Sequence, residues 1–556
     1  MRSMLLPFFV VCSLLVGLID SGDAEEPKAD AAKYLHGVQA FADTVLEHGR
    51  DTCGEEKTPL FVDGLHAKTL EPVRWKKDGQ TWVLCNFASQ QNLMRTLDGL
   101  TALTGDAKYR QAAEDATRDA LHRLQAPSGL LYWGGHLAWD LDQDKPVGQG
   151  NDSHEMKGHQ PYYRLMHRVA PDATRRLMEA VWAGHILDWS RLDYNRHASV
   201  RRTGRPKWDH EFADDIEVPF PSVGENLSFC NVTPSLIHAG IELAILADSV
   251  DALLWTGRLV QRWQQGRDPN TGLCGGQLSY RQHDRAQDAL GHVHPTINEA
   301  KMVVSYHQSS RYHDLPLVQM QAAEALRRDG GKRETTFAQE LIDTASEDLK
   351  IYARQCYDPE SGQLIGRMTD GTAIQWKEAK TGYYVPESFA PRDPNGELFW
   401  GYCLAYRLTG DEAHKQMIDR LGVHFGLWPA NSVGDPAEPF ECSDWRLIYG
   451  LLDLTEATGD ARYLKAACRV GDNLLRTQAG SGLFPRSGRE YARTGDDIPL
   501  ALLHLAAALS GRRADIPAAV FDRRFFHCEY HGELEEYQKK RADARTYDHY
   551  VFYGDS

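Results

Sequence analysis

The chain has 556 residues, a formal net charge of −16 and ten cysteines that include no C-x-x-C pair. The acidic balance excludes a broad basic face for nucleic acid. The dispersed cysteines predict mostly buried free thiols, with at most a bridge or two, in place of a disulfide framework. This length exceeds that of a usual domain, so either several domains or one large repeat-built body is expected.

The first 24 residues have the pattern of a secretory signal peptide. Arg2 precedes an apolar run over residues 5–19, and small residues at 22–24 lead into a charged segment. The apolar run is short for a bilayer-spanning helix, which favours cleavage over the alternative of an uncleaved anchor. No other stretch is long and apolar enough to span a membrane. We therefore expect a secreted or periplasmic protein without stable membrane insertion.

Two turn motifs recur along the rest of the chain. Thr-Gly-Asp occupies 104–106, 409–411 and 458–460, each time between two helix-like apolar patterns. In such a turn Gly ends one helix and Asp caps the next. A second turn rich in Pro, Ser and Gly follows the later helix of a pair, at 125–130, 268–273, 358–362 and 478–483. This order predicts helical hairpins repeated around a ring or along a solenoid.

The predicted fold is an all-α (α/α) toroid, or barrel, of six or seven helical hairpins, with seven favoured and short strands in the loops. Strand-like alternation is confined to short runs such as residues 131–133, which excludes a doubly wound sheet. The long, irregular units disfavour an open solenoid. No Pro/Ser linker divides the chain, so we expect one catalytic barrel domain over 25–520. Residues 521–556, rich in Tyr, His and charge, are expected to form a tail packed on the barrel.

Three connectors at helix ends hold unusual polar residues. His136 follows two glycines, Glu155 follows His154, and His197 closes the run 195–197. Glycines let backbone approach a ligand closely, and two imidazoles with one carboxylate suit a transition metal better than calcium, which prefers oxygen ligands. The alternatives are that each His is structural or solvated, and that Glu155 is an exposed acid near a helix start. Sequence spacing leaves open whether the three side chains meet.

Six segments in order resemble polysaccharide lyase family 2, the pectate lyases that include periplasmic forms. They are residues 58–64, 71–75, 86–92, 134–136, 154–157 and 195–197. The resemblance runs through most of the chain and is densest in its first third. It implies an (α/α) barrel of seven hairpins, in agreement with the repeats. It also implies that His136, Glu155 and His197 bind a divalent transition metal (Mn, Co or Ni), and that Arg196 abstracts a proton.

The implied reaction is β-elimination on polygalacturonate or its oligomers. The C5 proton of a uronate is acidic because a carboxylate lies beside it, and a divalent ion on that carboxylate stabilises the developing charge. A base removes this proton, the C4 oxygen leaves, and a 4,5-unsaturated end forms. Arg196 is a difficult base, but a neighbouring cation disfavours its charged form and predicts an alkaline optimum. The alternative role for Arg196 is a carboxylate clamp that never loses a proton.

Cations and aromatic rings around the same connectors are candidates for substrate binding. Lys157 and Arg201 could bind uronate carboxylates, or belong to a solvated basic loop. Trp133 could stack on a sugar ring, although aromatic residues at helical spacing more often belong to the core. The wider sets are the cations Arg202, Arg205 and Lys207 and the aromatic residues Trp139 and Tyr162. We expect the partner to be an anionic polysaccharide and the enzyme to be a monomer.

Two other classes of function remain open. A glycoside hydrolase of the (α/α)-barrel type, acting on a uronate-containing polysaccharide, needs two carboxyl groups, whereas an acidic loop is otherwise simply solvated. The candidates are Asp209, Glu211, Asp214 and Asp215. A non-catalytic extracytoplasmic sugar-binding protein would need a basic concave face but not the His/Glu/His set beside Arg196. The His pairs at 292/294 and 527/531 have no evident third ligand and are expected to be ordinary polar residues.

Overall fold

The computed structural model describes residues 25–77, 80–148, 152–156, 158–224, 227–281, 291, 298–303, 310–374, 390–435, 437–485 and 490–522. Fourteen α-helices lie within these ranges. They are α1 (Glu25–His48), α2 (Gln91–Thr104), α3 (Ala107–Arg123), α4 (Tyr163–Val169), α5 (Pro171–His185), α6 (Thr233–Ala247), α7 (Val250–Gln265), α9 (Ser310–Asp329), α10 (Lys332–Cys356), α11 (Gly396–Thr409), α12 (Glu412–His424), α13 (Arg446–Thr458), α14 (Ala461–Leu475) and α15 (Ile498–Leu509). The expected leader, residues 1–24, lies outside the described residues.

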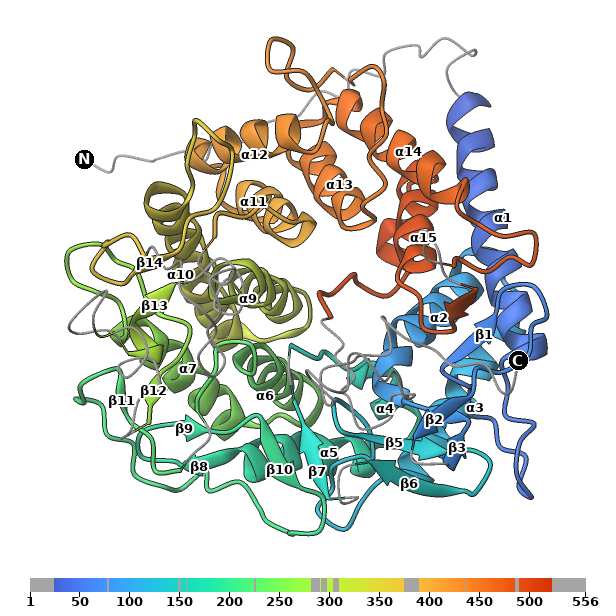
Figure 1. Cartoon of the computed structure of the whole chain (residues 1–556), viewed down its shortest axis with the longest axis horizontal. Coiled ribbons are helices and arrows are strands. Elements are labelled where there is room, and N and C mark those ends of the chain that lie inside the picture. The colour runs from blue at the N-terminus through green and yellow to red at the C-terminus, as the bar shows by residue number, and fades with distance from the viewer. Residues whose placement is uncertain are drawn as a thin grey trace, which may run out of the picture.

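The described helices form an inner and an outer ring around one axis (Figure 1). Six hairpins follow the chain, each with its first helix on the inside: α2–α3, α4–α5, α6–α7, α9–α10, α11–α12 and α13–α14. The seventh pair joins α15 on the inside to α1 on the outside, so the two ends of the helical chain close the ring. The predicted all-α toroid of seven hairpins is therefore confirmed.

The Thr-Gly-Asp turns connect an inner helix to the outer helix that follows it, as predicted. Gly105, Gly410 and Gly459 each end an inner helix in the left-handed region, with φ of 79°, 68° and 69°. A Cβ is unfavourable there, so glycine is the residue that stops the helix at this point. The next residue caps the outer helix by accepting a backbone N–H, and the three caps are Asp106, Asp411 and Asp460.

The second recurring turn returns the chain from the outer ring. After α3, the Ala126 N–H donates to the Leu130 carbonyl at 2.8 Å, and the side-chain amide of Gln125 donates to the carbonyl of Gly129 at 3.0 Å. The same two hydrogen bonds recur after α14, within residues 478–483. Similar sequences at these sites therefore make the same local structure.

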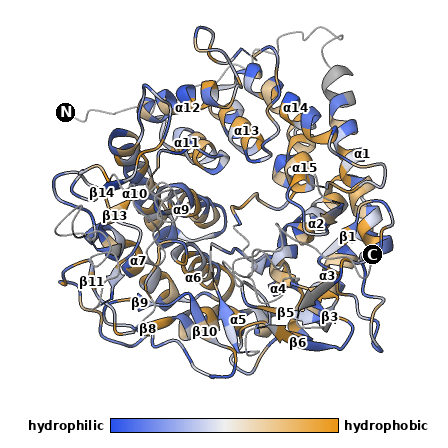
Figure 2. Cartoon of the chain, viewed as in Figure 1, coloured by the Kyte–Doolittle hydropathy of each residue, from blue (hydrophilic) through white to orange (hydrophobic). Residues whose placement is uncertain are grey.

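The two rings differ in how they are buried. Outer helix α14 buries Tyr463, Ala466 and Val470 along one face, at the spacing of an amphipathic helix. Inner helix α15 is buried over most of its length, because it packs against neighbours on several sides. Figure 2 shows polar residues along the outward side of α12 and α14 and apolar residues toward the ring. The core is thus a continuous layer between the two rings.

Short strands lie in the connections between helices. They are β1 (Gly64–His66), β2 (Trp75–Lys77), β3 (Gln80–Trp82), β4 (Leu84–Cys85), β5 (Leu137–Asp140), β6 (Lys145–Gly148), β7 (Ser153–Glu155), β8 (Ile186–Asp188), β9 (Asp193–Tyr194), β10 (His197–Ser199), β11 (Phe220–Pro221), β12 (Ser279–Tyr280), β13 (Met302–Val303), β14 (Arg367–Met368) and β15 (Tyr491–Arg493). β4, β5 and β6 form a three-stranded sheet, and β7 pairs with β10. β4 precedes α2, whereas β5, β6 and β7 lie in the connection before α4 and β10 lies in the connection before α6, and these last two connections hold the predicted site residues.

The chain after α15 turns into the ring. Phe521 is buried, and its N–H donates to the Gln321 side chain of α9 at 3.0 Å. The Asp522 carboxylate lies 2.8 Å from His159 Nδ1 and accepts the Gln160 N–H at 3.1 Å. Of the expected tail over 521–556, these two residues are the ones that the structure describes.

The described cysteines agree with the expectation of free thiols. All eight are unbridged, and five of them are buried. Among the described residues, no helix combines the length and the apolar character that are needed to cross a bilayer.

Candidate metal centre

The three predicted metal ligands come from connections that the fold brings together. His136 precedes β5, Glu155 ends β7 and His197 begins β10. β7 and β10 pair antiparallel with Glu155 directly opposite His197. Opposed residues of a sheet point to the same face, so this register alone places two of the three ligands together. The two strands lie side by side at the lower rim of the ring in Figure 1.

The ligand atoms converge on a common point. His136 Nε2 lies 3.1 Å from His197 Nε2. The Glu155 carboxylate lies 3.4 Å from His136 Nε2 through one oxygen and 3.5 Å from His197 Nε2 through the other. Within the described ranges, this is the one group of at least three His, Cys, Asp or Glu side chains whose ligand atoms come within 4.8 Å of one another.

These separations fit a transition metal. Ligand atoms about 2.1 Å from an ion at tetrahedral or octahedral angles lie about 3.0–3.4 Å apart. Two nitrogens and one carboxylate match the preferences of transition metals, whereas calcium would require an oxygen shell.

Two glycines make room for the Glu155 carboxylate. Gly134 has φ of 99°, and a Cβ there would lie 2.7 Å from the backbone oxygen of Glu155. A Cβ on Gly135 would lie 1.9 Å from Glu155 Oε2, inside van der Waals contact. The paired glycines before His136 are therefore required by the close approach of Glu155, whereas their sequence pattern had predicted a close approach of backbone to a ligand.

The site is more exposed on the side of Arg196. The side chains of Glu155 and His136 are 0% and 9% exposed, whereas those of His197 and Arg196 are 25% and 29% exposed. Burial lowers the pKa of His197, which favours the neutral imidazole that a metal requires. Arg196 Nε lies 3.5 Å from Glu155 Oε1, and its guanidinium lies over the ring of Phe229. Arg196 is thus the charged group at the open edge of the ligand set.

A chain of buried hydrogen bonds lies behind the ligands. The Trp133 indole N–H donates to His154 Nε2 at 3.0 Å, and His154 Nδ1 lies 3.0 Å from His185 Nε2. His185 Nδ1 in turn lies 2.7 Å from the Asn195 carbonyl oxygen. Burial lowers the pKa of His154 well below its ordinary value, and that of His185 to about 4. We call these four residues, Trp133, His154, His185 and Asn195, the histidine relay.

The sequence did not single out His185. It is the last residue of the amphipathic helix α5, where a histidine is ordinarily favoured by the helix dipole. His154 entered only as the neighbour of Glu155. The sequence contains only a weak indication of the relay. Each of Trp133, His154 and Asn195 lies on a connector that also holds a predicted ligand.

The three predicted substrate-binding residues differ in their exposure and in whether the structure describes them. Trp133 is 2% exposed and its N–H donates to His154, which favours the core alternative over the sugar-stacking role. Arg201 is exposed two residues after β10, in a stretch that also exposes Arg202, Arg205 and Lys207. Lys157 lies outside the described residues.

The carboxylates of the hydrolase alternative are not part of the group of described ligand atoms that come within 4.8 Å of one another. Asp209, Glu211, Asp214 and Asp215 are exposed, in a loop held against outer helix α7. In that loop the Trp208 carbonyl accepts the Trp255 N–H at 2.9 Å, and the Ala213 carbonyl accepts from Arg262 at 2.7 Å. The His pairs at 292/294 and 527/531 lie outside the described residues.

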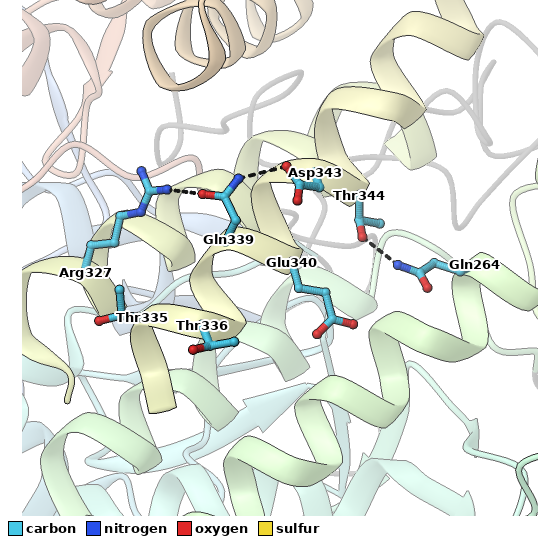
Figure 3. A pocket seen from close by; sticks show the side chains of 8 residues that line it. All are labelled: Gln264, Arg327, Thr335, Thr336, Gln339, Glu340, Asp343 and Thr344. Atoms are coloured by element: carbon cyan, nitrogen blue, oxygen red, sulfur yellow. Dashed lines mark hydrogen bonds between the residues drawn. The ribbon is translucent and has the colours of Figure 1, made fainter. Parts of the chain in front are cut away.

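A separate polar pocket lies on the outside of the barrel (Figure 3). It is lined by residues of α7, α9 and α10, and the side chains that line it pair with one another. Arg327 donates to Gln339 at 2.7 Å, and Gln264 donates to Thr344 at 2.6 Å. The pocket contains none of the predicted ligands and no aromatic ring for a sugar. It therefore adds nothing to the chemistry of the metal centre.

Known proteins similar to this chain agree with the predicted family. The chain is 27% identical over 533 residues to the pectate disaccharide-lyase of Dickeya dadantii (strain 3937), covering 90% of this chain and 93% of that protein. Solved structures with a similar outline are the GH76 α-mannanase of Bacteroides thetaiotaomicron, with 11% identity and a TM-score of 0.42, and the cellobiose 2-epimerase of Spirochaeta thermophila, with 12% identity and a TM-score of 0.41. They cover 88% and 89% of this chain, and 99% and 98% of their own. Similarity this low carries no argument about activity.

The family itself is established by a match over most of the chain. The sequence model described as periplasmic pectate lyase matches residues 58–529, which include His136, Glu155, Arg196 and His197. This chain therefore belongs to the periplasmic pectate lyase family and is a polysaccharide lyase that degrades pectate.

Proposed function

We propose that this lyase depends on a divalent transition metal bound by His136, Glu155 and His197, and that it cleaves polygalacturonate and its oligomers by β-elimination to 4,5-unsaturated products. The observation that carries the proposal is the convergence of these three side chains within 4.8 Å, beside Arg196. The name of the relative, pectate disaccharide-lyase, supports pectate as the substrate.

The metal site is supported by its donor set. His136 Nε2, His197 Nε2 and the Glu155 carboxylate would hold the ion, for which Mn, Co or Ni are the proposed identities. Such an ion supplies Lewis-acid chemistry, because it withdraws charge from a uronate carboxylate and makes the C5 proton more acidic. The buried carboxylate and the two imidazoles together leave the more exposed side of the site, near His197, for the substrate.

Arg196 is proposed to take the C5 proton. Its guanidinium lies at the edge of the ligand set, 3.5 Å from Glu155 Oε1, and 29% of its side chain is exposed. In the reaction the C5–H bond breaks, its electron pair forms the C4–C5 double bond, and the C4–O bond breaks with its pair on the departing oxygen. That oxygen then gains a proton. A base must be unprotonated, and guanidinium groups lose their proton only at high pH, which supports an alkaline optimum.

Binding of a polyanion to this acidic chain requires a local set of cations. Arg201 is exposed close to His197 in sequence, and Lys157 follows Glu155 on the adjoining connector. We propose that these two residues bind uronate carboxylates of the substrate. Arginine is suited to the task because its guanidinium can donate two parallel hydrogen bonds to one carboxylate.

We further propose that residues 1–24 direct export and are cleaved, and that the mature enzyme acts as a monomer in the periplasm or the medium. The N-terminal sequence pattern and the periplasmic description of the family support export. Residues 25–520 are proposed as the catalytic barrel, with 521–556 as an appended tail. The mass of the exported protein and its sedimentation would test these assignments.

The central test is the ultraviolet absorbance of the unsaturated product formed from polygalacturonate at alkaline pH. Protein treated with EDTA should be inactive, and added Mn²⁺ should restore the rise in absorbance. His197→Ala should lose the restored activity, whereas His210→Ala should retain it, because His210 is exposed in the loop beside α7.

The possible outcomes are distinct. Activity that resists chelation would contradict the metal dependence while leaving the lyase assignment intact. Reducing ends that appear without ultraviolet absorbance would instead indicate hydrolysis, and would contradict β-elimination. Full activity of His197→Ala would remove this residue from the ligand set.

A further inference from the structure

The histidine relay connects all three parts of the chain that hold the metal ligands and Arg196. Trp133 lies three residues before His136, His154 directly precedes Glu155, and Asn195 directly precedes Arg196 and His197. Of the ligands, His197 is partly exposed, whereas His154 and His185 of the relay are fully or almost fully buried. In β7, successive side chains point to opposite faces, so Glu155 faces the site while His154 faces the core.

The donor at one end of the relay and the acceptor at the other end fix which atom donates in each hydrogen bond. An indole N–H can only donate, so His154 Nε2 must accept from Trp133. A carbonyl oxygen can only accept, so His185 Nδ1 must donate to Asn195. One arrangement satisfies both ends: His154 is protonated at Nδ1 and donates to His185 Nε2, and His185 is protonated at Nδ1. Neither imidazole then has a nitrogen left for an ion or for a proton of the substrate.

We propose that the histidine relay is a positioning device, in which Trp133, His154 and His185 hold the three ligand-bearing connectors in the separation that the metal requires. This inference rests on the proposed metal dependence and goes beyond it, because none of the three residues contacts the ion or the substrate. His185 is the central element, since it is bonded to two connectors: its side chain lies 3.0 Å from His154 and 2.7 Å from the Asn195 carbonyl.

Contacts around the relay support this role. The backbone carbonyl of His185 also accepts the Asn195 N–H at 2.8 Å, so two hydrogen bonds hold Asn195 to the end of α5. The Asn195 side chain accepts the His197 N–H at 2.9 Å. On the other connector, Asn86 donates to the Gly134 carbonyl at 2.9 Å and accepts the Gly134 N–H at 3.1 Å. Breaking the relay would leave buried donors and acceptors unpaired, and the connectors would move to satisfy them.

The test compares His185→Phe with a matched control, His414→Phe. Both histidines are 0% exposed, and each has hydrogen-bond partners. His414 lies in α12, across the ring from β7 and β10 (Figure 1). The readouts are the dissociation constant for Mn²⁺ from competition with a chelator, the visible absorption of the Co²⁺-loaded protein, and the melting temperature of the metal-free protein.

We expect His185→Phe to weaken Mn²⁺ binding by about tenfold to 100-fold and to alter the Co²⁺ spectrum. His414→Phe should lower the melting temperature but keep Mn²⁺ affinity within about twofold of the unsubstituted protein, because additivity holds for distant sites. Trp133→Phe keeps an aromatic ring at a buried position but removes the indole N–H and some volume, so we expect it to fold with a lower melting temperature and to weaken Mn²⁺ binding several-fold. It keeps the inference testable if His185→Phe fails to fold.

A double substitution distinguishes two explanations of weaker Mn²⁺ binding: loss of one connected chain of hydrogen bonds, or general destabilisation of the protein. If His154 and His185 act through one chain of bonds, His154→Phe combined with His185→Phe should weaken Mn²⁺ binding no more than the worse single substitution. Additive losses, or relay variants that bind Mn²⁺ as well as His414→Phe does, would overturn the positioning role. Failure of the unsubstituted protein to bind Mn²⁺, Co²⁺ or Ni²⁺ would overturn the proposed metal dependence, and the inference with it.

Discussion

Glu155 and His197 lie directly opposite each other in the antiparallel pair β7–β10, and one carboxylate oxygen of Glu155 lies 3.5 Å from His197 Nε2. A shift of one residue in this register would turn one of the two side chains toward the core. The candidate metal centre therefore depends on the pairing of two three-residue strands.

The close contact between Gly135 and the Glu155 carboxylate predicts that a larger residue at position 135 will weaken metal binding. Gly135→Ala would place a Cβ 1.9 Å from Glu155 Oε2, so the carboxylate must move away from His136 and His197. We expect Mn²⁺ affinity to fall by more than about 100-fold, since loss of a ligand exceeds the cost of losing an outer partner. The control is Gly401→Ala in α11, where a Cβ meets nothing within 4 Å and should stabilise the helix by about 0.5–1 kcal/mol. Equal Mn²⁺ affinity in the two variants would contradict the close approach of Glu155.

Glu155→Gln should separate metal binding from folding. The substitution keeps the shape but removes a buried charge, so the metal-free variant should melt at the same temperature as the unsubstituted protein or higher. With the metal at 100 times its dissociation constant, the unsubstituted protein should gain about 2.7 kcal/mol of stability, and the variant should gain none. Calorimetry with and without Mn²⁺ measures both effects. A metal-dependent rise in the melting temperature of the variant would show that Glu155 is dispensable.

The role of Arg196 can be read from steady-state kinetics. Arg196→Gln can still donate a hydrogen bond to a carboxylate but cannot accept a proton. If Arg196 is the base, kcat should fall by about 10²–10⁴-fold while KM changes little. Arg201→Gln should show the opposite pattern, with a higher KM and nearly unchanged kcat, because Arg201 is exposed and proposed to bind substrate. A raised KM with unchanged kcat in Arg196→Gln would instead identify Arg196 as a carboxylate clamp.

Buried histidines remote from the metal centre predict acid sensitivity. Desolvation lowers the pKa of His414 from 6.5 to about 4 and that of His504 to about 3. Between these values and 6.5 the unfolded chain binds the proton and the folded chain does not, so stability is complete above pH 6.5 and falls as the pH is lowered. Each such group contributes up to about 1.4 kcal/mol per pH unit in that window.

The measurement is chemical denaturation of the metal-free protein across this pH range. His414→Phe should be less stable than the unsubstituted protein at neutral pH, but its stability should fall less steeply as the pH is lowered. Parallel curves for the two proteins would mean that His414 titrates in the folded state as it does in the unfolded state.

The sequence by itself determined the local elements of this protein. Glycine is favoured in the left-handed conformation that ends a helix, and Asp is favoured as the cap that begins the next helix. The helix–helix turns at 104–106, 409–411 and 458–460 were therefore predictable from residue type. Repetition of these turns between apolar helices predicted a ring of hairpins. The resemblance to a known family singled out His136, Glu155 and His197 as candidate metal ligands, because these residues occur in a recognisable order and at recognisable separations along the chain. Separation along the chain says nothing about the distance between the side chains.

The tertiary structure decided what those elements do together. Closure of the ring by α15 against α1, and the register that opposes Glu155 to His197, depend on contacts between residues far apart in the chain. The same is true of Trp133, whose sequence suited either a sugar platform or the core, and whose N–H is bonded to His154. His185 has no local signal at all, because its role is defined by partners on two other connectors. Residue types and turns specify short-range geometry, whereas burial and hydrogen-bond partners exist only once the chain is packed.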